Sequence, residues 1–86
     1  MSERRQHTRI PLATRVAISH PKIGTRIMTT RDLSNGGVFL LCDPDEMPPT
    51  GTVLEGQVQD GIGEMPVVKM TIVRVEPDGI GVRFDI

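Results

Sequence analysis

The sequence has 86 residues, which is enough for one small domain and too few for two separate hydrophobic cores. Apolar residues make up 37% and charged residues 24%, the net charge is −1, and no apolar run approaches the roughly 18 residues of a membrane-spanning helix. The start of the chain lacks the apolar stretch of a secretory signal peptide, and the single cysteine excludes an internal disulfide bond. We therefore expect a cytoplasmic protein that does not contact the membrane.

The first segment of the chain is the basic one. Residues 1–31 carry seven basic groups against one acid, whereas the remainder carries three against ten. We expect residues 1–13 to form a flexible basic N-terminal arm in which Arg4, Arg5 and Arg9 lie close together. The planar fork of a guanidinium matches phosphate oxygens, and its flat face stacks on aromatic bases. By itself this pattern also fits a solvated tail.

Residues 14–86 read as a chain of short strands. Runs rich in β-branched residues alternate with Gly, Pro, Asn and Asp, which indicates an all-β barrel or sandwich. The predicted strands are residues 14–19, 24–33, 37–41, 52–59, 66–75 and 80–84. Val, Ile, Leu and Met must build the core, because Phe39 and Phe84 are the only aromatic residues. The strand over 66–75 is apolar on both faces, so we expect its outer face to meet the arm, a partner or a ligand.

A second motif follows the predicted strand 24–33, where Asp32, Ser34 and Gly37 form the pattern Asp-x-Ser-x-x-Gly. A tight hairpin explains Asn35-Gly36 and Gly37, because these residues supply the positive φ angles of primed turns. It explains Asp32 and Ser34 less well, since both precede the turn and share one strand face. A carboxylate and a hydroxyl placed in this way can read the hydrogen-bonding edge of a planar ligand such as guanine.

These two motifs together resemble those of PilZ domains, which are bacterial receptors for the second messenger cyclic di-GMP. Arg5-x-x-x-Arg9 is followed by about 20 residues of predicted strand and then by the Asp32 to Gly37 motif. The ending, residues 79–84, is similar to the closing strand of the family, so the resemblance spans residues 3–85. It implies a six-stranded antiparallel β-barrel, with the arginine arm folded over the outer surface of the barrel.

The resemblance also implies the ligand contacts. Arg5 and Arg9 would contact the phosphates and stack on guanine, while Asp32 would accept hydrogen bonds from a guanine edge. The implied cyclic di-GMP-binding residues are Arg4, Arg5, Arg9, Asp32, Ser34, Gly36 and Gly37. In the family, an arginine at the position of Arg4 accompanies an intercalated pair of ligand molecules, so we expect two molecules here. No cofactor and no metal ion is implied.

The C-terminal end differs from many members of the family. Those members continue into a helix that caps the barrel, whereas this sequence stops at Asp85-Ile86. An uncapped barrel would favour self-association or docking on a partner. We expect ligand binding to order the arm and so to signal to a downstream effector protein.

Other functions are less well supported by the residues. Ser34 lacks the glycine-flanked context of a catalytic serine, and Cys42 is typical of a small core residue, so we expect no enzyme. The acidic segment 43–46 reads as a solvated turn rather than a calcium loop. Two alternatives are a small β-barrel that binds nucleic acid through its arm and a structural interaction module. We expect no nucleic-acid binding, because such barrels use exposed aromatic residues as stacking surfaces and this chain has two Phe residues.

Overall fold

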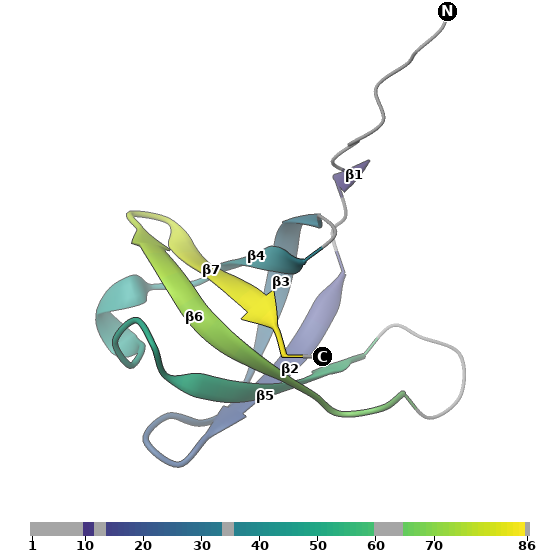
Figure 1. Ribbon diagram of the computed structural model, residues 1–86, viewed down its shortest axis with the longest axis horizontal. Helices are drawn as coiled ribbons and strands as arrows, with labels where there is room; N and C mark the ends of the chain where they lie inside the picture. The colour runs from purple at the N-terminus through teal and green to yellow at the C-terminus, as the bar shows by residue number, and fades with distance from the viewer. Residues whose placement is uncertain (1–9, 12–13, 34–35, 60–64, 86) are drawn as a thin grey trace, which may run out of the picture.

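Alternating apolar residues give short strands that Gly- and Pro-containing turns connect (Figure 1). The computed structural model describes residues 10–11, 14–33, 36–59 and 65–85. The strands are β1 (Ile10–Pro11), β2 (Arg15–His20), β3 (Gly24–Leu33), β4 (Gly37–Leu41), β5 (Val53–Val58), β6 (Val68–Glu76) and β7 (Gly79–Phe84). A 3-10 helix, η1 (Pro44–Glu46), lies between β4 and β5. In the part of the chain that is described, no helix has the length and apolar character needed to cross a membrane.

All neighbouring strands pair antiparallel, in the order β1-β3-β2-β5-β6-β7-β4. A further pairing between β3 and β4 joins the two sides of this sheet, so that β2 to β7 form a closed six-stranded barrel. Closure leaves none of these six strands as a free edge along its whole length. The predicted barrel is confirmed, and each predicted strand lies within two residues of its observed bounds.

The two-residue strand β1 is a feature that the sequence pattern did not predict. It pairs with the end of β3, where Ile10 lies opposite Leu33 and Pro11 lies opposite Asp32 (Figure 1). The last part of the predicted arm thus runs antiparallel to the strand that carries Asp32.

The inward-facing side chains form one core of Val, Ile, Leu and Met, as the composition predicted. Its buried members are Val16, Ile18, Met28, Leu40, Leu54, Met70, Ile72, Ile80 and Val82. Phe84 packs against the edge of this cluster and is partly buried. Phe39 is 3% exposed, yet it does not belong to the core, because its strand neighbours Val38 and Leu40 are the ones that pack inward.

Two β-bulges interrupt the regular alternation. The register of β3 against β4 shifts just before Asp32, and that of β6 against β7 shifts just before Arg74. The bulged residues are Arg31 in β3 and Val73 in β6. A strict two-residue period would point Asp32 and Arg74 toward the core. Since each bulge adds one unpaired residue, both side chains lie on the outer face instead.

A candidate ligand site on the outer face of the barrel

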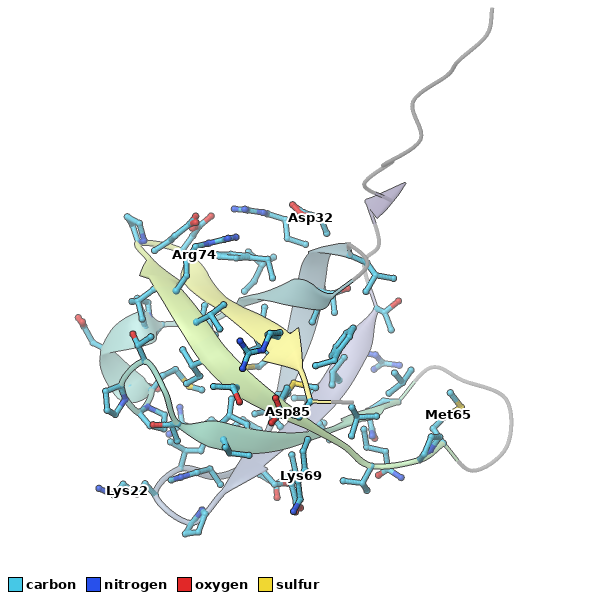
Figure 2. All side chains as sticks on the ribbon, in the orientation of Figure 1. Lys22, Asp32, Met65, Lys69, Arg74 and Asp85 are labelled. Carbon is cyan, nitrogen blue, oxygen red and sulfur yellow. The ribbon has the colours of Figure 1, made fainter. Side chains whose placement is uncertain are left out.

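Four residues lie side by side across the outer face and form what we call the outer row. Asp32 on β3 is paired with Phe39 on β4, Phe39 with Gly81 on β7, and Gly81 with Arg74 on β6. Figure 2 shows Asp32 and Arg74 at the same end of the barrel, away from Lys22 and Lys69. An open cavity of about 360 Å³ lies over this row.

Predicted and unpredicted residues share this cavity. It is lined by the predicted ligand residues Asp32, Gly36 and Gly37. The predicted residues Arg4, Arg5, Arg9 and Ser34 lie outside the described residues. Three arginines that the sequence motifs did not identify also line the cavity: Arg31, Arg74 and Arg83. None of the three belongs to either motif, and Arg74 lies on the outer face because of the β6 bulge.

The Phe39 ring is buried on the outer face by two guanidinium groups. The Cζ atom of Arg31 lies 3.9 Å from the ring centroid, and that of Arg74 lies 5.7 Å from it. Such contacts between a cation and a ring face are favourable, by about 0.5–1 kcal/mol at exposed sites. Glycines on β7 make the arrangement possible. A Cβ atom added at Gly81 would lie 3.2 Å from the Arg74 Cζ atom, and one added at Gly79 would lie 2.8 Å from the Phe39 ring.

Carboxylates from β3, from the end of β6 and from the β6–β7 turn form ion pairs with both guanidinium groups. Arg31 Nη1 donates to Asp78 Oδ2 at 3.1 Å, and Arg31 Nε donates to Asp32 Oδ2 at 3.4 Å. Arg74 Nε donates to Glu76 Oε2 at 2.8 Å. These side chains are 25–57% exposed, and exposed ion pairs contribute only about 0–1 kcal/mol. An anionic ligand can therefore replace the carboxylates at small cost.

The backbone conformation of Gly36 and Gly37 differs from the predicted one. Among the described residues, the glycines with positive φ are Gly24 and Gly51, so the positive φ expected at Gly36 and Gly37 is wrong. Gly37 is needed because its backbone lies against β7, where an added Cβ atom would overlap the carbonyl oxygen of Val82. Gly36 has open space around it and is exposed at the cavity. Its backbone is thus accessible to a ligand.

The arm enters the barrel beside this cavity. Ile10, the residue that follows Arg9, is paired with Leu33, and Pro11 is paired with Asp32. The backbone next to the Arg5-x-x-x-Arg9 motif and the carboxylate of the second motif therefore meet at one corner of the barrel. This pairing connects the two motifs, although they are separated by more than 20 residues in the sequence.

The remaining polar candidates have structural roles. Burial raises the pKa of the half-buried Cys42 thiol, whose Sγ atom lies 3.8 Å from the Leu40 carbonyl oxygen. A raised pKa disfavours the reactive thiolate. Asp43 caps η1 by accepting a hydrogen bond from the Asp45 backbone amide at 3.0 Å, and Glu46 forms an ion pair with Arg26. Within the described residues, no three His, Cys, Asp or Glu side chains gather as a metal site.

Comparisons with known proteins agree with this fold. The family model described as the PilZ domain matches residues 3–86. No curated protein sequence matches the chain. The solved structure of the Bacillus subtilis inhibitor of motility (MotI/DgrA) is similar, with a TM-score of 0.72 and 13% identity. The match covers 99% of this chain and 44% of that chain, so the present sequence spans less than half of that protein. Because the family model covers nearly the whole sequence, this chain belongs to the PilZ domain family, a family of non-catalytic receptors for cyclic di-GMP.

Proposed function

We propose that this protein is a cytoplasmic receptor that binds cyclic di-GMP between its arginine arm and the outer face of the barrel. The pairing of Pro11 with Asp32 is the observation that supports this most strongly. It brings the chain that follows Arg9 to the edge of a cavity lined by Asp32, Gly36 and Gly37. A single ligand in the cavity is therefore within reach of both motifs.

Each part of the ligand has a suitable partner in this arrangement. The Asp32 side chain is 25% exposed, and its carboxylate accepts hydrogen bonds from the N1–H and N2–H groups of one guanine. The guanidinium groups of Arg5 and Arg9 bind the phosphates, and Ser34 with the backbone of Gly36 completes the contacts. Charge-assisted hydrogen bonds of this kind are about twice as strong as neutral ones.

Binding is transmitted to a downstream effector protein by ordering the arm. Ordering a segment costs conformational entropy, which the contacts between arginine and phosphate offset. The ordered arm and the covered cavity together form a surface that the ligand-free protein lacks. The effector recognises this surface. The same surface can also mediate self-association of the barrel, which sedimentation velocity with and without cyclic di-GMP would detect.

Titration calorimetry with cyclic di-GMP tests the proposal directly. Removing one charge-assisted contact costs about 1.5–3 kcal/mol, so Arg5→Ala and Arg9→Ala should each weaken binding about ten- to two-hundredfold. Lys22→Ala is the control, because it also removes one positive charge but lies far from Asp32 (Figure 2). Equal affinities for the wild type, both arginine variants and the control would contradict the role of the arm.

The same titrations test the number of bound molecules. Arg4 offers a third guanidinium plane and charge for an intercalated pair of ligands. Arg4→Leu should therefore lower the stoichiometry from two molecules to one without abolishing binding. A stoichiometry of two in the variant would rule out this role for Arg4.

Competition distinguishes this function from nucleic-acid binding. Two of the arginines beyond the arm, Arg31 and Arg74, are paired with carboxylates rather than forming a continuous phosphate-binding track. A single-stranded oligonucleotide of equal charge should not displace cyclic di-GMP from the protein. Displacement at similar concentrations would favour the nucleic-acid-binding alternative.

A further inference from the structure

The two ends of the barrel are filled differently. The β2–β3 turn and η1 lie at one end, and the last residues of β5 and β7 lie at the other (Figure 1). At the first end, Ile23, Cys42 and Met47 pack against the core. At the second end, a cavity of about 360 Å³ enters the barrel. The chain thus closes one end with its own apolar side chains, and its described residues leave the other end open.

This cavity lies on the axis of the barrel. Each of the six strands contributes an apolar side chain to its wall: Val16, Leu33, Val38, Val58, Val68 and Phe84. Barrels of about eight strands have an interior just wide enough for their own side chains, so six strands leave only a narrow axial space. The occupant of the cavity must therefore be thin as well as apolar.

We propose that the open end of the barrel binds one unbranched alkyl chain, such as the acyl chain of a fatty acid or of a lipid. Such a chain is thin enough to enter along the axis, whereas a fused-ring group needs a wider opening. The polar head group of the ligand stays in water at the open end. The site is separate from the proposed cyclic di-GMP site, so its test does not depend on binding of that nucleotide.

The cavity offers water few hydrogen-bond partners. Thr30 is 6% exposed, and its hydroxyl oxygen accepts a hydrogen bond from the Thr14 backbone amide at 3.1 Å. Every buried side-chain nitrogen and oxygen in the described part of the chain has a hydrogen-bond partner. A buried water needs about two to four polar partners, so an apolar occupant is favoured. Since an apolar cavity of about 150 Å³ binds benzene, this one holds roughly ten carbon atoms or more.

The floor of the cavity is adaptable. Met70 is 3% exposed, and its methyl group lies over Gly56, where an added Cβ atom would be 2.7 Å from Met70 Cε. The fully buried Ile18 lies beyond them, with its Cδ1 atom 3.2 Å from the same position. Methionine has three rotatable bonds and fills irregular spaces. Met70 can therefore change its rotamer as the chain enters, in the space that Gly56 leaves.

Methyl NMR of the wild-type protein tests the proposal. With ¹³C-labelled methionine methyl groups, decanoate below its critical micelle concentration should shift the Met70 signal and leave the Met47 signal unchanged. Met47 is the matched control, because it also packs against the core but at the filled end of the barrel. No shift at Met70, or equal shifts at both residues, would overturn the proposal.

Chain length gives a second test in the same protein. Each CH₂ group that enters the cavity should strengthen binding about fourfold, so affinity should rise from hexanoate through octanoate to decanoate. The Met70 signal or calorimetry measures this series. Equal affinities for the three carboxylates would mean that only the head group binds, and the alkyl site would be wrong.

A variant that fills the cavity gives a third test. Val68→Phe places a larger side chain at the open end and should weaken decanoate binding about tenfold or more. Val53→Phe is the matched control, because Val53 is 48% exposed and lines an open cleft with Glu55 and Lys69. Binding by Val68→Phe equal to the wild type would contradict the site. If Val68→Phe does not fold, the two measurements on the wild type decide the question.

Vesicles of phosphatidylcholine and phosphatidylglycerol distinguish the two sources of the chain. Cosedimentation of the wild type with vesicles, lost in Val68→Phe and kept in Val53→Phe, would assign the acyl chain of a lipid. Decanoate binding without cosedimentation would assign a free fatty acid.

Discussion

Gly36 and Gly37 are adjacent and chemically identical, but the barrel constrains them very differently. Gly37 touches the β7 backbone, where an added Cβ atom would overlap the Val82 carbonyl oxygen, whereas Gly36 has open space. Neither has a positive φ angle. The constraint at Gly37 is therefore a close approach of two strands, and it is absent at Gly36.

This difference gives a prediction for stability. Gly37→Ala must push β4 and β7 apart, and overpacking of this kind costs about 1–3 kcal/mol. Gly36→Ala is the control and should change the free energy of unfolding by less than about 0.5 kcal/mol. Urea denaturation followed by circular dichroism measures both. Equal stability of the two variants would show that β4 and β7 are not in close contact at Gly37.

At the scale of secondary-structure elements, most of the barrel was predictable because its strands follow a local rule. Apolar residues at alternate positions and turn residues between them predicted β2 to β7 within two residues. The η1 helix and β1 were not predicted. Strand β1 has only two residues, and its existence depends on its pairing with β3, which is distant in the sequence.

The two bulges also escaped prediction, because they too depend on pairing with another strand. A bulge is a shift in pairing between two strands, so no single strand encodes it by composition. A signal was nevertheless present: strict alternation would have pointed the charged side chains of Asp32 and Arg74 into an apolar core. Burying an unpaired charge is costly, so this conflict is itself evidence for a shifted register. The same conflict would have indicated that Arg74 belongs to the candidate site with Asp32.

The β6–β7 turn offers a prediction at this scale. Its residue Asp78 accepts a hydrogen bond from Arg31 and places a negative charge beside the cavity. Asp78→Asn should strengthen cyclic di-GMP binding by up to about fivefold. The variant lacks the negative charge that repels the ligand phosphates and that competes with them for the Arg31 guanidinium group. Asp45→Asn is the control, because it removes the same charge from an exposed residue that lies in η1 rather than in the turn beside Arg31. Equal or weaker binding by Asp78→Asn would show that the carboxylate positions Arg31 for the ligand.

For the whole molecule, stability depends on a core that contains few large side chains. The buried cluster has no aromatic member, and a domain of this size buries only about 60–65% of its unfolded surface. The Phe39 ring lies on the outer face, against Arg31 and Arg74, and does not add to this core. The margin of stability is therefore small, and single core truncations should have large effects.

Two leucines allow this to be measured with one type of substitution. Leu54 is 1% exposed in the core, and Leu41 is 37% exposed on β4. Leu54→Ala should lower the free energy of unfolding by about 2–5 kcal/mol, which is enough to unfold a marginal domain. Leu41→Ala should lower it by less than about 1 kcal/mol. Thermal denaturation of both variants makes the comparison, and similar losses would mean that the interior is loosely packed.

The bulge at Val73 has a practical consequence. Val73 lines the cavity and is 43% exposed, so the extra residue of β6 sits at the rim of the ligand site. The chain contains no tryptophan and no tyrosine. A Val73→Trp variant would carry one fluorophore, without background emission, at the position where a nucleotide base can quench it. Ligand binding could then be followed by the fluorescence of this single tryptophan.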